Sequence, residues 1–139
     1  MGSIVFNYHN TTPLLQNKLL VKSAIARIFA EEKVAFRSLS LIFCTDEFLL
    51  KLNQEYLNHD TLTDILTFNL EASSLPIVGE IYISVERVEE NSVNLGVPLI
   101  QELYRVMIHG VLHLCGYKDH TPAQKALMRK KEDYYLTFV

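Results

Sequence analysis

The stretch from His109 to His120 most constrains the fold, because it predicts a helix that carries two histidines and ends at a glycine. Its residues are H-G-V-L-H-L-C-G-Y-K-D-H. Residues four apart in an α-helix lie about one turn and roughly 6 Å apart, so His109 and His113 can reach one ion. Gly116 is expected to end the helix in a left-handed turn. That turn would return Asp119 or His120 to the same ion as a third ligand.

A set of three protein ligands is typical of a catalytic metal, since it leaves a fourth position free for water. A bare pair of histidines four apart is common by chance and often structural, but the glycine and the Asp-His dipeptide favour a metal. Nitrogen and oxygen ligands favour zinc, one ion per chain. Zinc peptidases of the H-E-x-x-H type carry a glutamate where this chain has Gly110. The pattern therefore predicts a metallohydrolase other than an ordinary protease.

The motif H-G-x-L-H-L-x-G followed by Asp-His resembles the signature of the YbeY family. The segments Thr63–Phe68 and Gly79–Ser84 resemble two strands of that family, and Asn53–Tyr56 precedes the first at the family's spacing. The resemblance implies a metal-dependent endoribonuclease that is specific for single strands and contains one zinc ion. It also implies maturation of the 16S rRNA 3′ end, ribosome quality control, and rRNA and the small ribosomal subunit as partners.

Three departures from the family pattern bear on this site. The family's third histidine lies ten residues after the first, and here that position is Asp119, with His120 next. Either one extra turn residue, Lys118, lets His120 bind, or the spacing is kept and Asp119 binds; the second needs no remodelled turn and is favoured. The family's arginine after the N-x-x-Y tyrosine, thought to hold phosphate, is Leu57 here. The usual aspartate of the second strand is Glu80.

Candidates for acid–base and phosphate chemistry are Asp64, Glu80 and Arg105. Asp64 and Glu80 are candidate bases, and so is whichever of Asp119 and His120 does not bind the metal. Arg105 lies one turn before the first motif histidine, so it can face the metal and replace the charge missing at position 57. Structural roles are equally plausible: Asp64 in a turn or cap, Glu80 accepting from a ligand imidazole, and Arg105 paired with a carboxylate such as Glu80.

Charge gives no support to RNA binding. The chain has 13 basic and 16 acidic residues and a net charge of −3, whereas nucleic-acid binders are often basic. Arg129, Lys130 and Lys131 form a short basic run, but Glu132 and Asp133 follow at once. Such a mixed cluster predicts a solvated helix face. Only the family resemblance points to RNA.

Length, composition and the two cysteines indicate a cytoplasmic protein. With 139 residues and 49% hydrophobic content, the chain suits one domain over 1–139 with a real core. Two cysteines are too few for a disulfide scaffold. We expect neither a membrane span nor a signal peptide, since no apolar run approaches ~18–20 residues and the N-terminus lacks a charged segment. No small-molecule cofactor is expected.

The periodicity of apolar residues predicts the element order βαβαββααα. The predicted strands are Ile4–Tyr8, Leu39–Cys44, Ile65–Leu70 and Gly79–Ser84. The predicted helices run from Thr12-Pro13 to about Glu32, from an Asp46 cap to Tyr56, from Val85 to about Leu95, from Pro98 through the histidines, and from a capping box at Thr121 and Gln124. Residues 57–63 are polar and predict a loop. The expected fold is an α/β (α+β) domain with a mixed four-stranded sheet, about five helices and a zincin-like metal helix.

Overall fold

The computed structural model describes residues 2–57 and 63–139, and the predicted element order is confirmed. Most of the predicted loop at 57–63, including His59, lies outside these residues. The strands are β1 (Ser3–Tyr8), β2 (Phe36–Cys44), β3 (Ile65–Asn69) and β4 (Ile77–Ser84). The helices are α1 (Lys18–Glu31), α2 (Asp46–Leu57), α3 (Val85–Leu95), α4 (Leu99–Leu114) and α5 (Pro122–Leu136).

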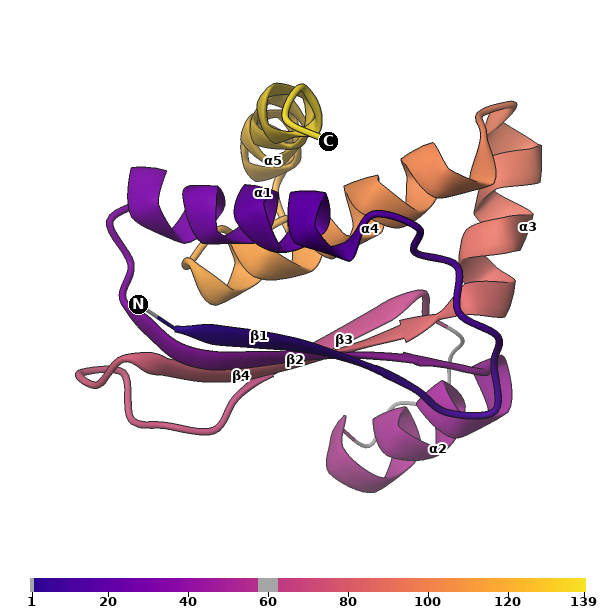
Figure 1. The fold of residues 1–139 in the computed structure, drawn as a ribbon, viewed down its shortest axis with the longest axis horizontal. Helices are drawn as coiled ribbons and strands as arrows, with labels where there is room; N and C mark the ends of the chain where they lie inside the picture. Colours follow the sequence, from indigo (N-terminus) through magenta and orange to yellow (C-terminus); the bar gives the residue numbers. More distant parts are fainter. Residues whose placement is uncertain (1, 58–62) are drawn as a thin grey trace.

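The four strands form one mixed sheet in the order β1-β2-β4-β3. Strands β1, β2 and β4 are parallel to one another, and β3 is antiparallel to β4. Helices α1 and α4 cover one face of the sheet, α5 packs on the outer side of α4, and α2 lies on the opposite face (Figure 1). The predicted mixed sheet with five helices is therefore confirmed.

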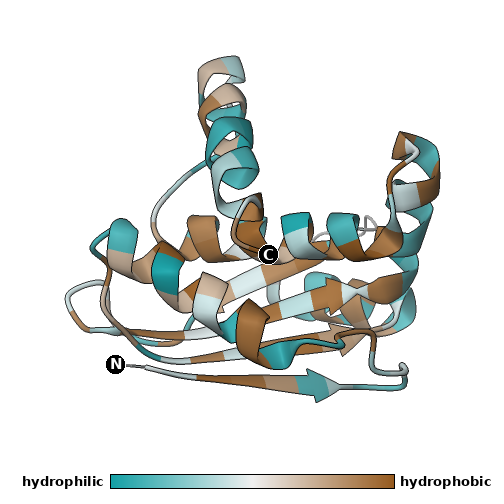
Figure 2. Cartoon of the chain, turned by 45° about the horizontal axis from the view of Figure 1, so that its top comes forward, coloured by the Kyte–Doolittle hydropathy of each residue, from teal (hydrophilic) through white to brown (hydrophobic). Residues whose placement is uncertain are grey.

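The main core fills the layer between the sheet and α1 and α4. Leu39, Leu41 and Ile81 point from the central strands into this layer, and Val111 and Leu112 of α4 meet them; all five are fully buried. In Figure 2 hydrophobic residues run along the central strands, while α5 carries a larger share of hydrophilic ones. Because α4 packs against β3 and β4 through this layer, its C-terminal turn, which carries the two histidines, lies over these two strands.

Gly110 allows α4 to approach the sheet closely. A Cβ atom at this position would lie 2.6 Å from Ile65 Cδ1 and 3.2 Å from two carbons of Ile81. Gly110 therefore faces the sheet, whereas His109 beside it faces Glu132 and Asp119. A glutamate at position 110 would meet β3 and β4 instead of these side chains, so the H-E-x-x-H arrangement does not fit this fold.

We expect Gly110→Val to destabilise the chain by about 1–3 kcal/mol, because two methyl groups would be forced against Ile65 and Ile81 in a packed layer. Urea unfolding followed by circular dichroism measures the change. Ala126→Val, at an exposed position of α5, is the control for the helix propensity of valine and should cost less than about 0.7 kcal/mol. Equal losses in the two variants would contradict the close-approach explanation.

One predicted helix start and one predicted cap are wrong. Helix α1 begins at Lys18, not at Pro13, because the Asn17 side chain accepts a hydrogen bond from the Leu20 N–H and caps the helix there. The segment before it is not helical, and its Leu15 is buried in the core. Helix α2 is capped by the Thr45 hydroxyl, which accepts from the Phe48 N–H, so the predicted cap at the next residue is wrong.

The predicted cap of α5 is confirmed. The Thr121 hydroxyl accepts from the Gln124 N–H, and the Gln124 side chain accepts from the Thr121 N–H. Among the helices of the described residues, none has both the length and the apolar character that a membrane span requires.

Candidate metal centre

The last turn of α4 brings His109 and His113 together. Their Nε2 atoms lie 2.9 Å apart, and the rings meet edge to face. The helix ends at Leu114, and Gly116, two residues on, has a φ of 104° that favours glycine. The Gly116 N–H donates to the His113 carbonyl and the Tyr117 N–H to the Leu112 carbonyl, which is the Schellman pattern. The chain turns back as the sequence predicts.

This turn brings Asp119 to the two histidines, and these three residues are called the metal group below. Asp119 Oδ2 lies 3.3 Å from His109 Nε2 and 3.5 Å from His113 Nε2. In a tetrahedral zinc site with bonds of about 2.0–2.1 Å, neighbouring ligand atoms are roughly 3.3 Å apart. One ligand atom from each of the three residues therefore fits a single ion of this kind, and the group lies within 4.8 Å overall. An ion held by one oxygen and two nitrogens in this way would keep its fourth coordination position open.

The other nitrogen of each imidazole is held by the protein. His109 Nδ1 lies 2.6 Å from Glu132 Oε2, and His113 Nδ1 lies 2.9 Å from the Tyr117 carbonyl oxygen. A carboxylate and a carbonyl only accept, so each Nδ1 donates its N–H to its partner, and each Nε2 lies on the side of Asp119, where it could bind a metal. Fixing the tautomer and the ring orientation in this way is typical of protein metal sites.

Glu132 connects this centre to Arg105. The Glu132 side chain is only 6% exposed; its Oε1 accepts from Arg105 Nη1 at 3.0 Å, and Asp133 accepts from Arg105 Nη2 at 2.9 Å. Burial lowers the pKa of His109, but Glu132 and the nearby carboxylates outweigh it and raise that pKa above its ordinary value. Arg105 thus lies near the metal group, paired with α5 and not with Glu80.

The sequence motifs did not mark Glu132 as part of the site. Its signal was present, because the buried residues of α5 are Met128, Glu132 and Tyr135, at helical spacing. An acidic residue inside an apolar stripe is rarely buried without a partner. The sequence could not name that partner, since it lies 23 residues away on another helix.

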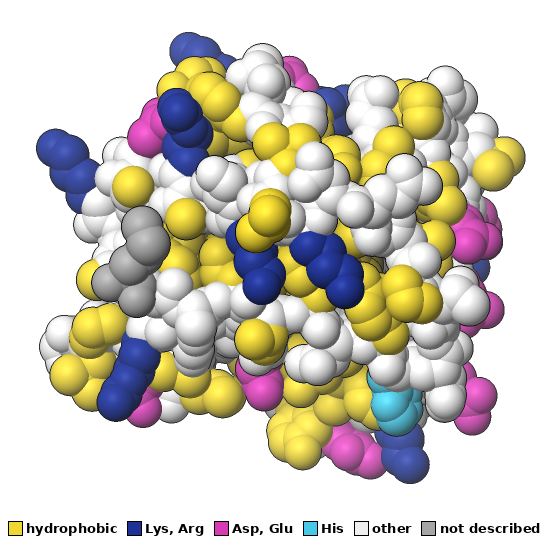
Figure 3. Space-filling view, viewed as in Figure 1, with side chains coloured by type: hydrophobic (Ala, Val, Ile, Leu, Met, Phe, Trp, Pro, Cys, Tyr) yellow, Lys and Arg dark blue, Asp and Glu magenta, His cyan; other side chains and the backbone are white. Residues whose placement is uncertain are grey.

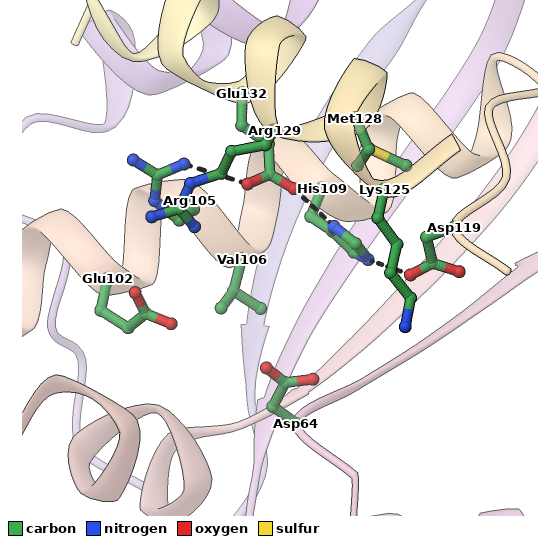
Figure 4. Close-up of a pocket in the computed structure, with 10 residues that line it drawn as sticks. All are labelled: Asp64, Glu102, Arg105, Val106, His109, Asp119, Lys125, Met128, Arg129 and Glu132. Atoms are coloured by element: carbon green, nitrogen blue, oxygen red, sulfur yellow. Dashed lines mark hydrogen bonds and ion pairs between the residues drawn. The ribbon is translucent and has the colours of Figure 1, made fainter. Parts of the chain in front are cut away.

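An open pocket of about 290 Å³ lies beside the metal group (Figure 4). Its lining residues are Asp64, Glu102, Arg105, Val106, His109, Asp119, Lys125, Met128, Arg129 and Glu132. Asp64 faces His109 across the pocket, and its Oδ2 accepts from Asn91 Nδ2 at 3.3 Å. Burial raises the pKa of Asp64 and also that of Glu102 above their ordinary values. Of the candidate bases, Asp64 therefore shares a cavity with the metal group.

Glu80 and His120 lie outside this group. Glu80 is on the far face of the sheet, where it accepts a hydrogen bond from the Tyr82 hydroxyl at 3.1 Å and lines a groove with Phe68 and Tyr56. In β4 the residues on either side of it, Gly79 and Ile81, are buried on the face toward α4. Because successive side chains of a strand point to opposite faces, the Glu80 side chain points away from α4. His120 is exposed, and its backbone N–H donates to Gln124 Oε1. The structure thus gathers His109, His113 and Asp119 without either residue.

Glu32, at the end of α1, anchors the turn that carries Asp119. Its carboxylate accepts from the hydroxyls of Tyr117 and Tyr135, both at 2.5 Å, and pairs with Lys131 Nζ at 3.1 Å. Burial raises the pKa of Glu32, but these three donors outweigh burial and lower it below the ordinary value. Since the Tyr117 carbonyl holds His113, Glu32 links α1 to the metal centre through one residue.

We expect Glu32→Gln to lower the free energy of unfolding at pH 7 by about 1–3 kcal/mol, because the donors lose a charged acceptor. A lowered pKa means that the ionised form stabilises the fold above the unfolded-state pKa, and that this stability is lost as pH falls through the folded-state pKa. The gap between wild type and variant should therefore close in acid. Glu31→Gln, whose partners Arg27 and Tyr134 are more exposed, is the control and should cost less than about 1 kcal/mol. A gap that persisted unchanged in acid would contradict this role.

Comparison with known proteins identifies the family. The family profile described as Endoribonuclease YbeY matches residues 6–139. The chain belongs to the YbeY family. Among its relatives, the Endoribonuclease YbeY of Flavobacterium psychrophilum is 47% identical over 94% of this chain and 91% of its own length. That of Amoebophilus asiaticus is 47% identical over 88% of this chain and 83% of its own.

A solved structure shares the fold of this YbeY chain. The solution structure of TM1509 from Thermotoga maritima superimposes with a TM-score of 0.67 at 29% sequence identity. The match covers 97% of this chain and 87% of that one. The YbeY resemblance found in the sequence is therefore confirmed by the family profile and by the relatives.

Proposed function

We propose that this chain is a zinc-dependent endoribonuclease that cuts single-stranded RNA and acts in 16S rRNA 3′-end maturation and ribosome quality control. The observation that carries the proposal is the convergence of His109, His113 and Asp119 in a chain whose family is described as an endoribonuclease. The proposed partners are rRNA and the small ribosomal subunit, and the proposed location is the cytoplasm.

The donor set supports zinc. Two neutral imidazole nitrogens and one carboxylate oxygen are common zinc ligands, and three such ligands are typical of catalytic sites. When bound, zinc would act as a Lewis acid on a phosphoryl oxygen and would lower the pKa of water toward ~7. Glu132 and the Tyr117 carbonyl keep both rings oriented through the whole reaction, because each accepts from an Nδ1–H.

Asp64 is the proposed general base. Its carboxylate lines the same pocket as His109 and Asp119 but is not one of the three candidate ligands, so it could accept a proton without leaving the metal short of a ligand. A raised pKa makes the Asp64 carboxylate a better proton acceptor than an exposed aspartate. Arg105, which the sequence suggested for phosphate, has two carboxylate partners, so we propose that it positions Glu132.

The proposal is tested by measuring zinc content and RNA cleavage together, in wild type and in His113→Ala. We expect near-stoichiometric zinc and cleavage of an RNA that carries a 16S rRNA 3′-end precursor, and loss of both in the variant. The His113 side chain is 24% exposed and lies at the helix end, so circular dichroism should show that the variant stays folded.

Other outcomes would select other functions. Bound zinc without cleavage in any preparation would indicate a non-catalytic zinc-containing assembly factor. Cleavage of a panel of peptides or esters, with RNA left intact, would indicate a zinc hydrolase of another substrate class. A chain that binds no zinc would overturn the proposal.

A further inference from the structure

Two cations of α5, Lys125 and Arg129, line the pocket beside the metal group. Both side chains are exposed, and neither makes a hydrogen bond or an ion pair with the residues that the structure describes. Arg105 differs, because Glu132 and Asp133 neutralise it. Lys125 and Arg129 are thus the cations of this pocket whose donors are free to bind a ligand.

Their positions place both cations along one side of the pocket. They are four residues apart in α5, so they lie about one turn and roughly 6 Å apart on the same side of the helix. Figure 4 shows Lys125 reaching from α5 past His109, beside Asp119, with Arg129 farther along the helix near Glu132. A ligand that reaches the metal group would therefore pass within reach of one cation and then the other.

The basic run of α5 divides among three surroundings. Arg129 faces the pocket, Lys131 pairs with Glu32, and Lys130 lies in a separate hollow next to Leu127. The sequence predicted one solvated face for this run: Arg129 and Lys130 are exposed as predicted, whereas Lys131 is partly buried against Glu32. On the face shown in Figure 3 the Lys and Arg side chains are spread over several places among other groups. The pocket cations therefore stand out by their place beside the metal group and not by the density of charge around them.

The charge of the pocket favours an anion only when a divalent metal is present. Its lining carries four carboxyl groups and three cations, a formal charge of −1. A divalent ion would reverse that sign. A phosphodiester strand is the polyanion that would gain from both the metal and the cations.

We propose that Lys125 and Arg129 bind backbone phosphates of the RNA strand on either side of the phosphodiester at the metal. This inference rests on the proposed endoribonuclease function. The two cations supply, from α5, the positive charge that Leu57 does not carry. Arginine can bind a phosphate through two parallel N–H donors, whereas lysine acts as a point charge. Such contacts position the strand without selecting its sequence.

The test measures binding of a cleavage-resistant single-stranded RNA analogue to the zinc-loaded protein across a range of salt concentrations. For a single strand, each lost phosphate contact should reduce the slope of log K against log salt by about 0.7. Lys125→Gln and Arg129→Gln should each show this smaller slope and bind roughly tenfold more weakly in low salt. Arg129→Lys should restore most of the slope. Lys130→Gln removes the same charge from another side of α5, so it is the matched control and should keep the wild-type slope.

Three readings separate the possibilities. Zinc content is measured in every variant, and an unchanged value shows that the metal centre is intact. If wild type cleaves RNA while Lys125→Gln and Arg129→Gln keep its slope and affinity, this inference is wrong and the proposed function stands. If Lys130→Gln loses as much slope as they do, the effect is general charge and the inference is also wrong. If wild type neither binds nor cuts RNA, the proposed function fails and the inference with it.

Discussion

Replacing Asp119 with alanine is expected to abolish stoichiometric zinc binding and to lower the rate of RNA cleavage by roughly 10³-fold or more. The Asp119 carboxylate supplies one of the three ligand atoms that converge at the end of α4. Without it, only two imidazole ligands remain, which is too few to retain the ion. The Lewis-acid contribution of several kcal/mol is then lost. Metal content by mass spectrometry and single-turnover cleavage of an RNA precursor measure the two effects.

His120→Ala is the matched control for Asp119→Ala. His120 is the next residue along the chain, but it is exposed and lies outside the group of ligand atoms. We expect this variant to keep its zinc and its cleavage rate. If His120→Ala lost the metal and Asp119→Ala kept it, the turn would have to rearrange on metal binding, and the proposed ligand set would be wrong.

Replacing Asp64 with asparagine is expected to lower the cleavage rate by about 10²–10⁴-fold while zinc content stays unchanged. Asparagine has nearly the same size but cannot accept the proton, so the variant removes general-base catalysis alone. The matched control is Glu80→Gln, because Glu80 is the other candidate carboxylate and lies on the far face of the sheet. We expect its rate to match wild type.

The pH dependence gives a second test of Asp64. A base must be ionised, and burial raises the pKa of Asp64 above its ordinary value. The cleavage rate should therefore fall as the pH drops through this raised pKa, at a pH above the ~3.9 of an exposed aspartate. In Asp64→Asn this part of the profile should disappear. A profile left unchanged by the substitution would exclude Asp64 as the base.

Most of the fold could be predicted because its signals are local. Alternation and helical spacing of apolar residues mark the strands and helices, and the cap of α5 uses side chains three residues apart. The start of α1 was misplaced because Thr12 and Pro13 resemble a cap, whereas tertiary burial of Leu15 keeps that segment out of the helix. Propensity yields to packing at such a boundary.

The three candidate ligands were within reach of sequence analysis for the same reason. The histidine pair depends on helical spacing, and the return of the chain depends on a glycine that tolerates a positive φ. The sequence favoured Asp119 over His120 only through the spacing of the motif, since a shift of one residue in a turn changes which side chain points inward. The distances of 3.3 and 3.5 Å from Asp119 come from the tertiary structure.

The remaining parts of the site depend on contacts between distant segments. Glu132 meets His109 because α5 packs on α4, and Glu32 meets Tyr117 across 85 residues of chain. Asp64 and Glu80 looked alike in the sequence, yet the register of the strands and the side from which α4 crosses the sheet put only Asp64 in the pocket. The spacing of residues within one helix or turn can be read directly from the sequence, and this spacing predicted the helix that carries the two histidines and the turn after it. The whole chain folds so as to bury its apolar surface, and that packing decides which face of the sheet α4 covers and which side chains from other segments lie beside it. No short stretch of residues contains this information.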